Sequence, residues 1–266
     1  MKRFFYFLSF FCFILPSHAR LIDEPFPEVK TNQASIAHIK YIENQVKPLV
    51  SNKEELVKKI SASFLNTPYV AHQLIGDLHH KEILVADLQA LDCFTFIDYV
   101  EALKRAKNVS DFYNQLINIR YKGGQVSFFY RKHFFTDWAN GPKLIAEDIT
   151  KKLSPKHITV LKYLNMKNSH ELYLPGIKVV ERKVSYLPSN AVDKKVTNQL
   201  KTGDYIGAYT QLNGLDVSHV GIFINTPKGP VFRNASSRKE NMKVVDTPFA
   251  DYLKRIPGIV ILRPKQ

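Results

Sequence analysis

Apolar residues in the first part of the chain recur at helical spacing. They return every three or four positions through residues 35–47, and the same spacing continues through residues 56–64. Pro68 then interrupts the pattern, because a proline disfavours helical geometry at the residue before it. A loop and a short apolar segment at residues 83–88 follow. The sequence therefore predicts two helices before the first break.

Two further helices are predicted in the middle of the chain. Apolar side chains share one stripe along residues 92–106, and Cys93 lies in the first turn of this predicted helix. Residues 112–121 predict another helix, and residues 127–138 are dense in aromatic side chains. Such a density of aromatics is typical of a core, although it would also suit stacking on a sugar.

The second half of the chain is typical of strands. Its first part is irregular, with a helix-like piece at residues 158–164 and an extended piece at residues 177–184. Alternating or β-branched segments then predict four strands, at residues 204–209, 217–224, 231–235 and 259–262. Helices that come first and strands that come last predict an α+β fold rather than a parallel α/β sheet.

The first 19 residues have the order of a secretory signal peptide. Lys2 and Arg3 precede an apolar run, and small residues come before a cut at Arg20. We therefore expect an exported protein, periplasmic or secreted, with no transmembrane anchor, since no apolar run reaches the length of about 20 residues that a span needs. The remaining chain is divided into a leader with helices (residues 20–65) and one main domain (residues 66–266).

The chain is strongly basic, with a formal net charge of +14 over 266 residues. Such a charge attracts polyanions such as nucleic acid, a membrane surface or an anionic cell wall. The lysines are scattered, however, and there is no arginine-rich run, zinc-finger spacing or aromatic RNA-binding signature. We therefore expect no nucleic-acid partner, and the hydrophobic content of 45% is enough for a folded core.

Cys93 is the best candidate for a nucleophile. The other cysteine, Cys12, belongs to the predicted signal peptide, so the mature chain would hold a single thiol in an oxidising compartment. An unpaired thiol in such a compartment is expected either to be buried or to have a chemical role. A helix N-terminus favours a thiolate, and its free N–H groups suit the oxyanion that forms when a carbonyl is attacked. The alternative is a buried apolar cysteine.

His219 is the best candidate for the base that a thiol nucleophile needs. It lies in a predicted strand on the same face as Gly221, whose small size would leave room for a substrate or a helix end. Asn234 in the next strand falls on that face if the connecting loop has an even number of residues, and on the opposite face if it does not. An amide there would orient the imidazole. A histidine in a strand with only a structural role is the alternative.

The ordered motifs resemble the NlpC/P60 superfamily of cell-wall peptidases. These motifs lie at residues 67–70, 91–96, 202–206, 218–222 and 234–237. The segments at residues 91–98, 133–138 and 214–222 are more similar to its DUF1460 branch, whose members are understood to be N-acetylmuramoyl-L-alanine amidases. The resemblance implies a papain-like fold in which N-terminal helices pack on a C-terminal antiparallel sheet. Residues 66–266 would be the catalytic domain, with residues 141–200 as an irregular insertion.

The resemblance also implies a catalytic triad. Cys93 would be the nucleophile, His219 the base and then the acid, and Asn234 the orienting group. Asn234 stands where many NlpC/P60 enzymes have histidine, and Phe94 stands where a small or hydroxylic residue is expected. Six residues are candidates for substrate binding: Tyr69, Asp92, Thr95, Ser218, His133 and Trp138. No cofactor or metal is expected, because no triplet of His, Cys, Asp or Glu has metal-ligand spacing.

The expected substrate is peptidoglycan or its muropeptides, cleaved at the N-acetylmuramoyl-L-alanine amide. One alternative is the same machinery cutting between D-glutamate and the diamino acid. Another is a non-catalytic module that binds the wall through its basic charge. A secreted effector acting on another organism's wall or on host amides is a further possibility, and the sequence leaves the oligomeric state open.

Overall fold

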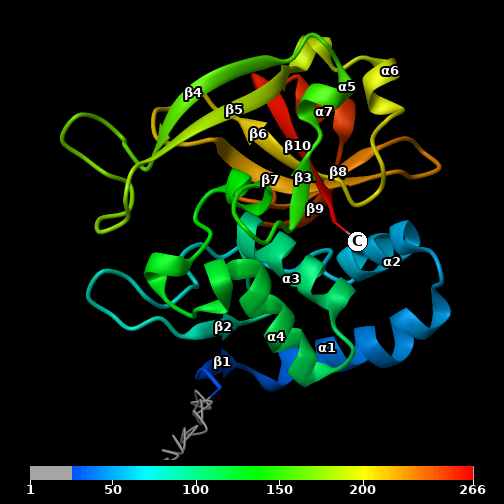
Figure 1. The fold of residues 1–266 in the computed structure, drawn as a ribbon. Helices are drawn as coiled ribbons and strands as arrows, with labels where there is room; N and C mark the ends of the chain where they lie inside the picture. Colours follow the sequence, from blue (N-terminus) through cyan, green and yellow to red (C-terminus); the bar gives the residue numbers. More distant parts are fainter. Residues whose placement is uncertain (1–25, 266) are drawn as a thin grey trace, which may run out of the picture.

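The computed structural model describes residues 26–265, which form two packed layers (Figure 1). The predicted signal peptide lies outside the described residues. One layer consists of the N-terminal helices, and the other is an antiparallel sheet built mainly from the C-terminal half. The predicted α+β arrangement is therefore confirmed.

Each main helix of the first layer is preceded by a capping asparagine or aspartate. The side-chain oxygen of this residue accepts backbone N–H groups of the first turn. These helices are α1 (Gln33–Tyr41), α2 (Lys53–Ala62), α3 (Cys93–Arg105) and α4 (Val109–Arg120). A π-helical turn (Ile42–Val46) and a 3₁₀ turn (Lys47–Leu49) continue α1. The helices predicted from apolar spacing are thus present.

The strands of the sheet follow the order β4-β5-β10-β6-β7-β8-β9, and β3 also pairs with β10. Every pair in this sheet is antiparallel. The strands are β3 (Ala146–Asp148), β4 (Ile158–Leu164), β5 (Val180–Pro188), β6 (Tyr205–Tyr209), β7 (Val217–Ile224), β8 (Val231–Ser236), β9 (Lys243–Pro248) and β10 (Gly258–Pro264). A separate parallel pair joins β1 (Val29–Thr31) to β2 (Leu84–Ala86), so part of the expected leader is a strand.

Both faces of the sheet are buried, each in its own core. Along β7, Val220 and Ile222 belong to the core shared with the helical layer, whereas Phe223 belongs to a second core. Three short helices contribute residues to or adjoin that second core and lie with the sheet in Figure 1: α5 (Thr150–Leu153), α6 (Lys194–Thr197) and α7 (Phe249–Leu253). Successive apolar side chains of one strand therefore pack alternately into the two cores.

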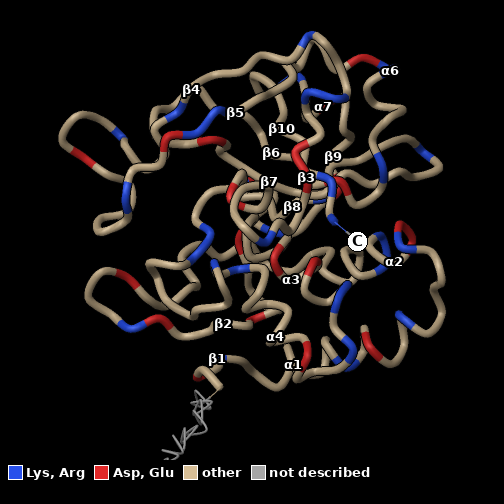
Figure 2. The backbone as a smooth tube through the Cα atoms, viewed as in Figure 1, with Lys and Arg blue, Asp and Glu red and all other residues tan. Residues whose placement is uncertain are grey.

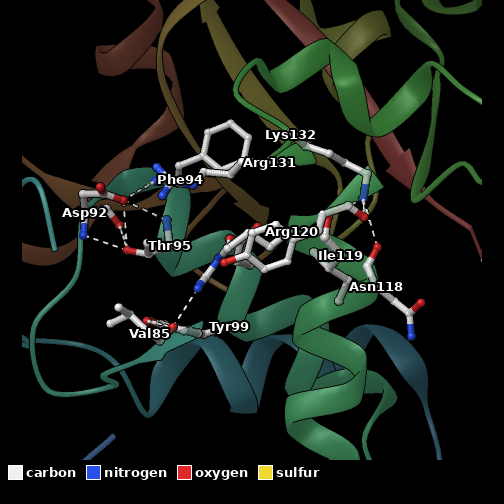
Figure 3. A network of polar contacts seen from close by, with 12 residues as sticks. Val85, Asp92, Phe94, Thr95, Tyr99, Asn118, Ile119, Arg120, Arg131 and Lys132 are labelled. Carbon is white, nitrogen blue, oxygen red and sulfur yellow. Dashed lines mark hydrogen bonds and ion pairs between the residues drawn. The ribbon is translucent and has the colours of Figure 1, made fainter. Parts of the chain in front are cut away.

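Helix α3 is anchored to its neighbours by buried ionic groups. Asp98 pairs with Arg120 of α4 at 2.8 Å, and Arg120 also donates to the carbonyl of Val85 in β2 (Figure 3). On the sheet side, the Tyr205 hydroxyl donates to Glu101 at 2.6 Å. Since a buried charge is tolerated only when paired, these contacts hold α3 between the two layers.

The helix-like interpretation of residues 158–164 is wrong. This segment is strand β4, which pairs along its whole length with β5, from Ile158 opposite Tyr186 to Leu164 opposite Val180. Its β-branched start suits a strand. The pairing partner lies outside any local window, however, so the spacing of apolar residues alone favoured the wrong structure.

Candidate active site

Cys93 is the first residue of α3, as the sequence predicts, and a capping box precedes it. Asp92 accepts the backbone N–H groups of Phe94 and Thr95 at 3.0 and 2.8 Å, and the Thr95 hydroxyl accepts the N–H of Asp92 at 2.9 Å (Figure 3). Asp92 and Thr95 thus fix the helix start. The cap does not use the N–H of Cys93, which lies next to the thiol of the same residue.

Cys93 is a half-buried residue whose side chain packs against the apolar core. Burial, followed by the negative charge of Asp92, raises the pKa of this thiol to about 12. Hydrogen bonds from the backbone N–H groups of Val220, Cys93 and Phe94 lower the pKa of the thiol, but by less than burial raises it. The resting cysteine is therefore a neutral thiol, and it needs a base to become a nucleophile.

His219 and Asn234 share one face of the sheet, and their side chains are hydrogen-bonded. Strands β7 and β8 pair with Ile222 opposite Arg233 and are joined by a loop of even length, residues 225–230. This register puts His219 and Asn234 on the diagonal, with 2.9 Å between Nε2 of His219 and Oδ1 of Asn234. The structure thus has the arrangement that the even loop predicts.

The hydrogen bonds of Asn234 fix the protonation of the imidazole. The Asn234 amide nitrogen donates to the carbonyl of Phe232 at 3.1 Å, so its oxygen must face His219. That oxygen is an acceptor, and Nε2 therefore carries the proton. Burial lowers the pKa of His219 below its usual 6.5, and the charge of Arg238 lowers it further. The hydrogen bond to Asn234 and the charge of Asp92 raise this pKa, but by less. The neutral imidazole leaves Nδ1 free to accept a proton.

The two halves of the site meet where the start of α3 packs against β7. The N–H of Val220, the residue after His219, faces the sulfur of Cys93. Gly221 does not leave open space here, contrary to expectation. A side chain at Gly221 would lie 2.6 Å from the carbonyl oxygen of Arg233 and 2.7 Å from the ring of Phe232, so the glycine allows close approach of β8.

A buried chain of hydrogen bonds, which the sequence did not reveal, supports the strand of His219. Asp216 accepts the backbone N–H and the hydroxyl of Thr136 at 2.7 and 2.8 Å, and it also accepts the N–H of Val217 at the start of β7. Arg182 of β5 donates to Thr136 and to Asp137. Residues 141–200, which had no assigned role, therefore supply one contact that supports the strand carrying His219.

Two other candidates lie close to the reacting groups. Burial, followed by the negative charges that Cys93 and Asp92 carry when ionised, raises the pKa of Tyr69, so its hydroxyl lies near Cys93. Ser218 is exposed beside His219 and lines a cavity there. Both positions are compatible with substrate binding, which stays a prediction.

His133 and Trp138 have contacts typical of structural residues. Trp138 has no exposed surface and packs edge to face against Phe94 and Tyr205, so it has no free face on which a sugar could stack. His133 shares a hydrogen bond of 2.8 Å with the carbonyl of Phe128, and burial lowers its pKa to about 4. These placements favour the core interpretation of the aromatic stretch.

Two cavities border the site. One of about 630 Å³ is lined by His219 and Asn234 together with Arg238, Tyr252 and Arg255. The other, of about 450 Å³, includes Asp92 in its lining, with residues from the loop at positions 72–79. Nothing in the sequence singles out these arginines, because no local pattern indicates that the segments after β8 and after α7 converge.

Within residues 26–265, no group of three or more His, Cys, Asp or Glu side chains is arranged to hold a metal ion. In the same residues, no helix combines the length and the apolar character that a membrane crossing requires. Lysines and arginines are distributed over both layers in Figure 2.

The fold, with N-terminal helices on a C-terminal antiparallel sheet, is that of DUF1460 amidase-like proteins. Residues 59–259 match the family model described as AmiA-like, N-acetylmuramoyl-L-alanine amidase-like. The chain belongs to this family, and membership indicates a hydrolase related to the cell wall.

Solved structures agree with this assignment. An N-acetylmuramoyl-L-alanine amidase from Bacteroides uniformis is 28% identical, and the match covers 80% of this chain and 99% of that one with a TM-score of 0.66. A DUF1460 protein from Legionella pneumophila has the same fold at 22% identity, with coverage of 88% and 98% and a TM-score of 0.69. None of the curated proteins matches the chain.

Proposed function

We propose that this protein is a cysteine-dependent peptidoglycan hydrolase that cleaves the N-acetylmuramoyl-L-alanine amide of muropeptides or cell wall. The observation that supports this most is the His219–Asn234 pair beside a cysteine at a helix start. It occurs in a chain of the amidase-like family. The three groups have the chemical roles of nucleophile, base and orienting amide.

The first half of the reaction forms an acyl-enzyme. Nδ1 of His219 accepts the thiol proton while Sγ of Cys93 attacks the carbonyl carbon of the lactyl group. The carbonyl oxygen becomes an oxyanion, which the N–H of Cys93 stabilises at the positive end of the α3 dipole. The imidazolium then gives its proton to the nitrogen of L-alanine. The C–N bond breaks, and the stem peptide leaves as a neutral amine.

The second half releases the sugar. A water molecule loses a proton to Nδ1 of His219 and attacks the thioester, and the second oxyanion occupies the same position. When the C–S bond breaks, the proton returns to the sulfur of Cys93. The products are the free enzyme and the carboxylic acid of muramic acid, which then loses its proton to solvent, and every step uses groups of this chain and water.

The pKa shifts of the two groups determine when the proton moves. The thiol of Cys93 has a raised pKa and His219 a lowered one, so thiol and neutral imidazole coexist at rest. Proton transfer then accompanies attack instead of preceding it. His219 has to be neutral for this step, and activity should therefore fall as the pH drops through its pKa, below 6.5.

Export is part of the proposal. The basic, apolar and small-residue order of residues 1–19 supports passage across the inner membrane, to the periplasm or the medium. Peptidoglycan lies in these compartments, so an exported hydrolase would meet its substrate there.

Defined muropeptides, with products weighed by mass spectrometry, test the activity. We expect release of an intact stem peptide from the sugar, and loss of at least about 10³-fold in turnover when Cys93 becomes Ala, because Cys93 is the only thiol among residues 26–265. Circular dichroism checks that Cys93→Ala is folded.

Each rival function gives a different outcome in this assay. Cleavage after D-glutamate, with no free stem peptide, would favour the endopeptidase. Unchanged turnover by Cys93→Ala would remove the thiol mechanism. No turnover by either protein, together with retained binding to sacculi, would favour a wall-binding module.

A further inference from the structure

The cavity of about 630 Å³ next to the triad has an unusual charge distribution. Two guanidinium groups, from Arg238 and Arg255, line it together with His219 and Asn234. The carboxylates in its wall are Asp246 and Glu240. How these charges pair decides what the cavity can bind.

One of the two carboxylates is already neutralised. Asp246 accepts two hydrogen bonds from Arg233, at 2.7 and 2.8 Å, and Arg233 is buried. Glu240 is exposed and reaches Arg238 only at 3.9 Å. Among residues 26–265, the side chain of Arg255 forms no hydrogen bond or ion pair. The cavity therefore has an excess of positive charge with unused donors, which suits a carboxylate ligand.

The position of the cavity relative to the triad shows which part of a substrate could enter it. His219 must protonate the leaving nitrogen, so the leaving group has to lie on the imidazole side of the cysteine. This cavity begins at His219 and Asn234, whereas the cavity that includes Asp92 lies on the side of the helix start. The leaving peptide would thus extend towards the arginines.

Tyr252 connects the nucleophile with the arginines. Its ring lines the cavity and stacks on Phe232, with 4.1 Å between ring centroids. Burial raises the pKa of Tyr252, and charges on Cys93 and on Arg238 both act on its hydroxyl. The reacting sulfur and the guanidinium of Arg238 are therefore near the same side chain.

We propose that this cavity is the subsite for the leaving half of the substrate, and that Arg238 and Arg255 bind a carboxylate of the released peptide. The inference rests on the proposed function and specifies it further, since the leaving group of the amidase is a peptide that bears free carboxylates. An arginine pair would select acidic peptides over amidated ones.

Paired substrates test the selection. N-acetylmuramoyl-L-alanyl-D-glutamate is compared with its diamide, which differs only in carrying no carboxylates. We expect the native protein to hydrolyse the acid with a kcat/KM roughly 10-fold or more above that of the diamide, since hydrogen bonds to charged groups contribute that much. Arg238→Gln and Arg255→Gln should each reduce this ratio, mainly through KM, and the double variant should bring it close to one.

Two neighbouring lysines supply matched controls. Lys239→Gln and Lys254→Gln remove the same charge one residue from each arginine, at positions that do not line the cavity. They should leave the ratio unchanged. A ratio near one in the native protein, or an equal fall in the lysine and arginine variants, would overturn the subsite while leaving the amidase intact.

A binding measurement keeps the inference independent of turnover. Cys93→Ala is titrated by calorimetry with L-alanyl-D-glutamate, the released dipeptide, and with its diamide. We expect the dipeptide to bind at least about 10-fold more tightly, Arg255→Gln to reduce this difference, and the additional Arg238→Gln to remove it. Equal affinities would overturn the inference. If neither muramoyl substrate is hydrolysed, the proposed function fails, and the calorimetry still decides whether the cavity binds carboxylates.

Discussion

The two halves of the candidate site are held in place by different kinds of contact. Cys93 is fixed by its immediate neighbours, since Asp92 and Thr95 form the capping box around it. His219 depends on distant segments. Its partner Asn234 is 15 residues away, and its strand is supported through Asp216 by Thr136, which is 80 residues from Asp216.

This difference predicts which substitutions should displace Cys93 and which should displace His219. A helix start is a local structure, so the position of the nucleophile depends on few residues. The position of His219 depends on the packing of β7 against β8 and on the contact between Arg182 and residues 136–137. Substitutions in the β4–β5 hairpin should therefore displace the imidazole of His219 more than the thiol of Cys93.

The largest effect is expected from removing the base. In His219→Gln the amide can still bond to Asn234, but it accepts no proton, and kcat/KM should fall by about 10³-fold. Alkylation of Cys93 by iodoacetamide and the thermal unfolding midpoint report whether the thiol half stays intact. An unfolded variant, or one with native turnover, would contradict the separation of the two halves.

The local half of the site was accessible to sequence reasoning. Helical spacing is a property of a short window, and it predicted that Cys93 lies in the first turn of a helix, as the structure has it. Period-two alternation left two possibilities for Asn234, and the even loop of the structure places it on the face of His219. In each case the relevant residues are neighbours in sequence or across one hairpin.

The non-local half was not accessible in the same way. Nothing in the spacing of Asp216 relates it to Thr136, and strand β4 was misassigned because its pairing partner is remote. The convergence of Arg238 and Arg255 on one cavity depends on how β8, β9 and α7 pack. Such contacts follow from the tertiary arrangement, which overrides local pattern.

An intermediate effect is expected from breaking the chain of hydrogen bonds below β7. Asp216→Ala leaves the buried N–H of Thr136 without its acceptor and should destabilise the protein by about 1–3 kcal/mol. Arg182→Gln should have a smaller effect on stability. Both variants should lower kcat by up to about 10²-fold, because a shift of the base by about 1 Å suffices for that.

Controls for this prediction lie on the same hairpin. Lys183→Gln removes a charge from the exposed neighbour of Arg182 and should leave both stability and kcat unchanged. Chemical denaturation and steady-state kinetics measure the two effects separately. If Arg182→Gln kept a native kcat, residues 141–200 would have no part in positioning His219.

The smallest effect is expected at Asp92, and it separates capping from charge. Asp92→Ala loses the acceptor for the N–H groups of Phe94 and Thr95, which should cost about 1 kcal/mol of folding stability. Asp92→Asn keeps a good cap and removes only the negative charge. Because that charge raises the pKa of Cys93, its loss should lower this pKa. At a fixed alkaline pH, iodoacetamide should then alkylate Asp92→Asn about 2- to 5-fold faster than the native protein. A rate equal to the native one would mean that burial alone holds the thiol neutral, and that the local half of the site tunes the position of the nucleophile but not its ionisation.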